Sequence, residues 1–131
     1  MKGSGRFLLD TNIIILILNR DKSIRKSLAE AREVLIPIIS VGELLFGAAK
    51  STRQKENLQV VQTFALHSSV LICDFAVAQE YGEIKNSLKS LGKPIPENDI
   101  WIASIARRWN LTLVTRDQHF QVVPGLHVEA W

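Results

Sequence analysis

Residues 8–15 read LLDTNIII, in which one aspartate separates two apolar runs. The first run predicts a short strand over Phe7–Leu9, and the second predicts a helix over Thr11–Arg20. Asp10 therefore stands at the junction of two elements that both belong in a core. A charged side chain is almost never fully buried unless it is paired. The fold around this stretch must give Asp10 a partner.

The rest of the chain alternates the same two patterns. Apolar runs predict strands at 34–38, 70–73, 111–115 and 126–129, and helices are predicted at 23–32, 40–51, 53–67, 75–91 and 97–110. Short, continuously apolar strands separated by helices are typical of an α/β protein with a parallel sheet covered on both faces. The length suits one domain, residues 1–131. In such sheets, sites form beyond the carboxyl ends of the strands.

The composition excludes several classes of protein. The single cysteine, Cys73, rules out an intrachain disulfide framework and favours a cytoplasmic setting. The longest uninterrupted apolar stretch, Ile13–Leu18, is far below the roughly 18 residues of a membrane span. The first residues do not form a signal peptide. The net charge of +3 is by itself only a weak indication of a polyanionic partner.

Five acidic residues stand where predicted strands end or predicted helices begin: Asp10, Glu43, Asp74, Asp99 and Asp117. Each of the first four has a structural interpretation when taken singly. Ser40 and Glu43 have the spacing of a capping box, and Asp10, Asp74 and Asp99 suit helix N-termini. For Glu43 and Asp74 alone, capping is the simpler interpretation.

Taken together, four of these acids predict a shared site. Capping accepts Ser, Thr or Asn as readily as Asp, so it does not explain an acid at each position. Strand C-termini and helix N-termini meet at one edge of a parallel sheet, so Asp10, Glu43, Asp99 and Asp117 can converge there. Clustered carboxylates need raised pKa values or a cation. Oxygen donors without His or Cys suit Mg²⁺ or Mn²⁺.

Such a site suggests nuclease chemistry. A metal-bound water can be activated to attack a phosphodiester. Without the four site acids, the chain has nine acidic residues against 16 basic ones, so the rest of the molecule is clearly positive. An acidic site within a basic surface suits a metal-dependent enzyme acting on nucleic acid.

Four segments, LLDTNIII, SVGELLFGA, GKPIPENDIWIA and LVTRDQHF, resemble in sequence and order those of the PIN-domain ribonucleases, especially VapC-type toxins of toxin–antitoxin pairs. The resemblance spans nearly the whole chain. It implies a three-layer α/β/α sandwich with a short, mainly parallel sheet, and Mg²⁺- or Mn²⁺-dependent endonucleolytic cleavage of RNA. It also implies a homodimer and a small cognate antitoxin. It places Asp10, Glu43, Asp99 and Asp117 in the acidic site, with Thr11, Asn12, Asn98 and Thr115 as orienting polar neighbours.

Other residues carry weaker indications. Arg116 and Lys93 could each hold an RNA phosphate near the acids, although a solvated loop charge is the simpler interpretation of either. The histidines at 67, 119 and 127 show no metal-binding spacing. The Ile13–Leu18 run is apolar nearly all round, so it is buried by its own fold or covered by a partner.

Two other functions stay open at this point. A receiver-like signalling domain also has an acidic Mg²⁺ pocket, and VLICDF with Lys93-Pro94 fits it superficially. The order of its motifs disagrees, because Lys-Pro should follow the strand that ends at Thr115 rather than precede it. A non-catalytic RNA- or protein-binding domain on the same fold is the other alternative, and the four intact acids argue against it.

Overall fold

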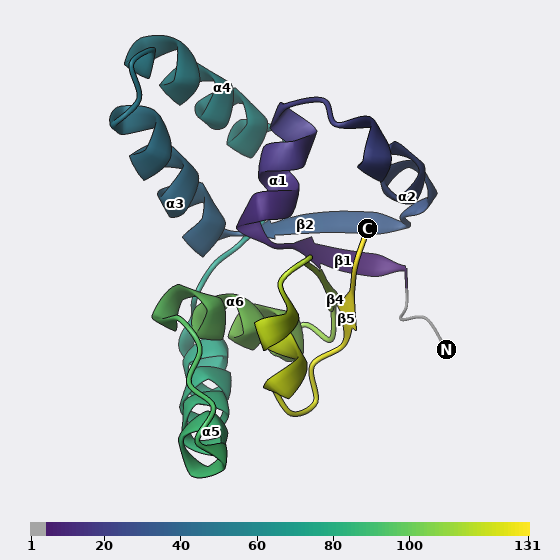
Figure 1. Ribbon diagram of the computed structural model, residues 1–131, viewed down its shortest axis with the longest axis vertical. Helices are drawn as coiled ribbons and strands as arrows, with labels where there is room; N and C mark the ends of the chain where they lie inside the picture. Colours follow the sequence, from purple (N-terminus) through teal and green to yellow (C-terminus); the bar gives the residue numbers. More distant parts are fainter. Residues whose placement is uncertain (1–4) are drawn as a thin grey trace.

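The sheet at the centre of the protein is parallel throughout. The computed structural model describes residues 5–131, and its strands follow the spatial order β3-β2-β1-β4-β5 (Figure 1). They are β1 (Arg6–Leu9), β2 (Glu33–Pro37), β3 (Ser69–Leu71), β4 (Thr112–Val114) and β5 (Val128–Glu129). In the central strand, Leu8 pairs with Leu35 of β2 and with Leu113 of β4. The apolar runs predicted this arrangement, because a strand buried on both faces has no polar side to show.

Helices cover both faces of this sheet (Figure 1). One face carries α1 (Thr11–Leu18), α3 (Ile38–Ala49) and α4 (Gln54–Leu66), and the other carries α5 (Phe75–Leu91), α6 (Glu97–Arg108) and the short 3₁₀ segment η2 (Gln118–Val122). Side chains along β1 alternate between the two hydrophobic cores, one on each face of the sheet. Phe7 and Leu9 face the first set of helices, and Leu8 faces the second. The three-layer α/β/α prediction is confirmed.

The connection from β1 to β2 differs from the prediction. The helix expected at 23–32 is divided into the 3₁₀ turn η1 (Lys22–Ile24) and the short helix α2 (Arg25–Glu30). The helix expected over Thr11–Arg20 ends at Leu18. Arg20 adopts a left-handed φ of 56°, its N–H donates to the Ile17 carbonyl, and the Asp21 N–H reaches the Leu16 carbonyl. This Schellman arrangement closes the helix without a glycine.

Two boundaries set the positions of later side chains. β2 ends in Pro37, and α3 begins at the next residue, two residues earlier than predicted. Proline is tolerated there because the strand needs no further ladder hydrogen bond at its end. The α5 helix ends at Leu91 as predicted, and Gly92 caps it with a φ of 64°. Within residues 5–131, no helix combines the length and hydropathy needed to cross a membrane.

Candidate active site

Asp10 lies where β1 passes into α1, at the carboxyl edge of the sheet. Its Oδ1 accepts the Thr11 N–H at 2.8 Å, so it caps α1. Its Oδ2 accepts the Thr115 hydroxyl at 2.8 Å, and its own N–H donates to the Val114 carbonyl at 3.0 Å. Only 5% of Asp10 is exposed. The partners of this buried carboxylate are therefore hydrogen-bond donors from two neighbouring strand ends.

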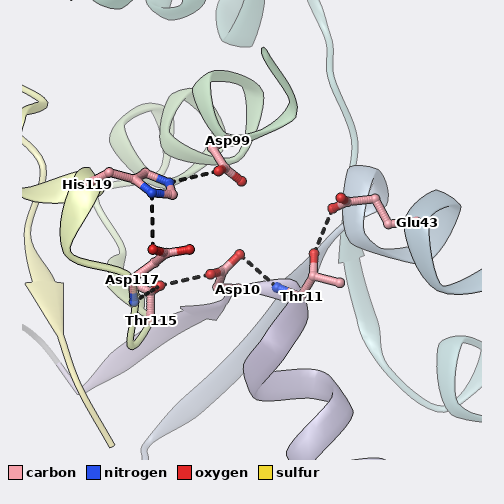
Figure 2. Close-up of polar contacts among 7 residues, drawn as sticks. All are labelled: Asp10, Thr11, Glu43, Asp99, Thr115, Asp117 and His119. Carbon is pink, nitrogen blue, oxygen red and sulfur yellow. Dashed lines mark hydrogen bonds and ion pairs between the residues drawn. The ribbon is translucent and has the colours of Figure 1, made fainter. Parts of the chain in front are cut away.

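Glu43 approaches the same place from the side of α3 (Figure 2). Because α3 begins at Ile38, Glu43 lies in its second turn, and the capping-box interpretation of Ser40 and Glu43 is wrong. The Thr11 hydroxyl donates to Glu43 Oε1 at 2.7 Å. Its single hydrogen is then used, so the buried Ser40 hydroxyl is the donor in their 2.7 Å contact. A chain of hydroxyls thus orients Glu43.

Asp99 and Asp117 are joined by a residue that the sequence analysis set aside (Figure 2). His119 Nε2 lies 2.8 Å from Asp99 Oδ2, and Nδ1 lies 3.1 Å from Asp117 Oδ1. The ring packs against the fully buried Phe120, with 4.6 Å between ring centroids. A protonated imidazole would donate to both carboxylates, and a neutral one to a single carboxylate.

The predicted acids and most of their predicted neighbours share one cavity of about 530 Å³. The Asp117 N–H donates to Thr115 Oγ1 at 3.0 Å, so Thr115 links Asp117 to Asp10 from behind the cavity wall. The lining consists of Asp10, Thr11, Asn12, Glu43, Pro96, Glu97, Asn98, Asp99 and Asp117. Segments far apart in the chain therefore meet at one opening, as the strand-end argument predicted.

The two basic candidates are not part of this lining. The Arg116 guanidinium donates to the Trp131 carbonyl and to the Ser23 hydroxyl, each at 2.9 Å. These contacts tie the C-terminal residue to η1. Lys93 is exposed in the connection between α5 and α6. A direct role for either residue in holding RNA phosphate stays a prediction.

Asp74 has the capping role that the sequence favoured. It is the N-cap of α5, and its Oδ1 accepts the Val77 N–H at 3.0 Å. β3 ends at Leu71, so Asp74 stands three residues beyond the strand rather than directly at its end. Because Asp74 is absent from the lining of the acidic cavity, it offers a natural control for the four acids.

Two of the cavity acids, Asp10 and Asp99, resist ionisation. Burial raises the pKa of Asp10 above its usual value. The hydrogen bonds from Thr115 and Thr11 lower this pKa, and the charges of Asp117 and Glu43 raise it. Burial, followed by the charge of Asp10, raises the pKa of Asp99, and contact with His119 partly offsets this. The carboxylates therefore repel one another across the cavity, and a cation would relieve that repulsion.

The residues present fit a hydrated Mg²⁺ or Mn²⁺. Carboxylate oxygens are the ligands that these hard cations prefer. Over residues 5–131, no group of three or more Asp, Glu, His or Cys side chains is placed to hold a metal ion directly. Mg²⁺ keeps several waters and takes only one or two carboxylates directly, so an open cavity lined by four acids suits it.

Comparison with known proteins agrees with this fold. The family model described as PIN domain matches residues 7–126. The tRNA(fMet)-specific endonuclease VapC of Shigella flexneri is 36% identical over 129 residues, which cover 96% of this chain and 98% of that protein. The similarity is therefore continuous rather than confined to motifs.

Solved structures give the same result. A DNA-bound VapBC from Salmonella typhimurium superposes with a TM-score of 0.89 at 34% identity, over 96% of this chain and 98% of that one. VapBC2 from Rickettsia felis, bound to a DNA fragment from its promoter, gives a TM-score of 0.88 at 29% identity, over 95% and 98%. The chain therefore belongs to the PIN-domain family, among its VapC-type members.

Proposed function

We propose that this protein is a metal-dependent endoribonuclease and the toxin of a type II toxin–antitoxin pair. The observation that carries the proposal is the convergence of Asp10, Glu43, Asp99 and Asp117 on one cavity. The charges of neighbouring acids also contribute to the raised pKa values of Asp10 and Asp99, and a cation would relieve that repulsion. The relative from Shigella flexneri is named as an endonuclease specific for tRNA(fMet), which supports RNA as the substrate class.

The chain's own residues would hold the metal and orient its ligands. When bound, Mg²⁺ or Mn²⁺ supplies an activated water and neutralises charge on the phosphate. Asp10 is fixed by two donors, the Thr11 amide and the Thr115 hydroxyl. His119 fixes Asp99 and Asp117 relative to each other. One of the four carboxylates accepts the proton of the attacking water.

The form of the cavity bears on the substrate. It has a volume of about 530 Å³, and its lining includes the exposed Asn12 and Asn98 as neutral hydrogen-bonding groups. An RNA backbone reaches such a site most easily from a loop or single-stranded segment, whose bases can turn outward. Hydrolysis by water should leave a 3′-hydroxyl and a 5′-phosphate.

The test is cleavage of a panel of structured RNAs by purified protein, in Mg²⁺ or Mn²⁺ and in EDTA. Wild type and Asp74→Asn should cleave with metal and not in EDTA, and Asp10→Asn should be inactive. Asp74→Asn controls for the loss of one carboxylate outside the cavity. Undiminished cleavage by Asp10→Asn, or a 2′,3′-cyclic phosphate product, would contradict the proposal. RNA binding without cleavage in any metal would favour the non-catalytic alternative.

A small cognate antitoxin is the proposed protein partner. The solved relatives from Salmonella typhimurium and Rickettsia felis are VapBC assemblies. A groove of about 460 Å³ between α1, α3 and α4 adjoins the acidic cavity, because Thr11 and Glu43 line both. Ile15 and Val60 expose 37% and 48% of their surface along it. An apolar segment docked there would cover these side chains and block the acids.

Co-expression tests this partner. The product of a short reading frame next to the gene should copurify with the protein and suppress cleavage. Val60→Glu should weaken that complex while leaving cleavage intact, because Val60 lines the groove and not the acidic cavity. We further propose a homodimer in the cytoplasm, and light scattering of the purified protein tests the dimer.

A further inference from the structure

A second cavity adjoins the acidic one at the start of α6. It has a volume of about 380 Å³, within the range of roughly 300–1,000 Å³ typical of small-molecule sites. Its wall is apolar and includes Leu88 of α5, Ile95 of the connection and Ile100 of α6. Glu97 lines both cavities, so the two open onto the same stretch of surface.

The shape of this second cavity is set by the end of α5. Gly92 takes a φ of 64°, and the Lys93 N–H donates back to the Leu88 carbonyl at 3.0 Å. The chain therefore reverses and lays Ile95 against the core between α5 and α6. Leu88 and Ile100 are only 2% and 4% exposed, so the wall is part of a packed core rather than of a loose loop. The cavity is preformed.

The charges on its rim differ from those of the acidic cavity. Lys85 Nζ lies 3.2 Å from Glu97 Oε2, so the charges of Lys85 and Glu97 neutralise each other. The same ammonium group also donates to the Tyr81 hydroxyl at 3.0 Å. Lys89 also lines the cavity. In the part of the chain that the structure describes, no hydrogen bond or ion pair engages its ammonium group. The rim therefore offers one available cation beside an apolar wall.

We propose that this cavity is a nucleotide subsite that receives the base of an RNA residue flanking the scissile phosphate. The base lies against Pro94 and Ile95, which leave apolar surface accessible in the lining, and Lys89 pairs with a backbone phosphate. This inference rests on the proposed function, since it takes the acidic cavity as the place of cleavage. An apolar face next to a cation is what an unstacked nucleotide requires, because its base is flat and weakly polar and its phosphate is anionic.

Binding of a fluorescein-labelled, single-stranded RNA in EDTA tests the subsite without cleavage. Fluorescence anisotropy across a salt series gives the affinity and its salt dependence. Lys89→Ala should reduce the slope of log affinity against log salt by about 0.7, the value for one lost phosphate contact on a single strand. The matched control is Lys26→Ala, which removes one exposed lysine from α2 and should leave the slope unchanged. Ile95→Ala should weaken binding by up to about 50-fold, since three side-chain carbons leave the apolar wall.

The outcomes separate the subsite from the proposed function. Equal slopes for Lys89→Ala and Lys26→Ala, or unchanged affinity for Ile95→Ala in a variant that stays folded by circular dichroism, would overturn the subsite even if wild type cleaves RNA. If Lys89→Ala and Ile95→Ala weaken RNA binding but wild type cleaves no RNA, the proposed endonuclease activity is wrong and the cavity is still an RNA-binding site. Loss of self-association in Lys89→Ala, seen by light scattering with RNA binding intact, would assign the cavity to a protein contact and overturn the proposal.

Discussion

Replacement of Thr115 by valine tests how the acidic cavity is held together. Valine has nearly the same shape, but it cannot donate to Asp10 Oδ2 or accept from the Asp117 N–H, contacts of 2.8 and 3.0 Å. Thr115 is only 2% exposed, so water cannot readily replace it. A hydrogen bond to a charged group is worth about 1.5–3 kcal/mol and a neutral one about 0.5–1.5 kcal/mol. We expect the free energy of unfolding at neutral pH to fall by about 2–4 kcal/mol.

The loss of unfolding free energy in Thr115→Val should increase with pH. The pKa of Asp10 is raised in the folded protein, mainly by burial, so ionisation of Asp10 costs stability as pH rises above its ordinary value of 3.8. The hydroxyl of Thr115 counteracts that rise. Without it the pKa of Asp10 rises further, and the loss of stability extends to higher pH. The difference between wild type and Thr115→Val should therefore be larger at pH 7 than near pH 4.5.

Urea unfolding in EDTA, followed by circular dichroism at both pH values, measures the effect. Thr112→Val is the matched control, because Thr112 is also buried in the β4 region, at 4% exposure. Within residues 5–131, no side-chain hydrogen bond involves its hydroxyl. Equal losses for the two variants, or a loss for Thr115→Val that does not change with pH, would show that Thr115 does not stabilise the ionised Asp10.

Three further substitutions separate the roles of single residues. Asp10→Asn should unfold at a higher temperature than wild type in EDTA at pH 7, because it removes a buried charge whose pKa is raised; a lower temperature would contradict this. Asp74→Ala should cost about 1 kcal/mol of unfolding free energy in urea with unchanged RNA cleavage, as the loss of an N-cap. His119→Ala should lower Mn²⁺ affinity roughly 10- to 100-fold in a calorimetric titration; unaltered affinity would show that His119 does not position Asp99 and Asp117.

The sequence predicted the sheet and its helical layers because both follow from local patterns. The run at Phe7–Leu9 is apolar without alternation, which is typical of a strand covered on both faces. The same argument located the acids, since Asp10 and Asp117 must follow strands whose carboxyl ends meet at one edge. The positions of Asp10, Asp99 and Asp117 in the cavity needed no knowledge of side-chain packing.

What the sequence missed depends on contacts between distant segments. The four acids together placed Glu43 in the shared site correctly, and only its capping interpretation fails, because α3 starts two residues earlier and both Ser40 and Glu43 turn toward Thr11. His119 lies in η2, a segment too short for periodicity to reveal. Its only signal was its place two residues after the last acid in TRDQHF. The bridge it forms requires the approach of α6 and η2, which no local pattern encodes.

Calorimetric titration of the protein with Mn²⁺ measures whether the four carboxylates form a cation site. Wild type and Asp74→Asn should bind the ion with the same affinity, and Asp10→Asn should bind it far more weakly, because Asp10 is the most enclosed of the four acids while Asp74 only caps a helix. No uptake of Mn²⁺ by wild type, or equal uptake by wild type and Asp10→Asn, would contradict the account.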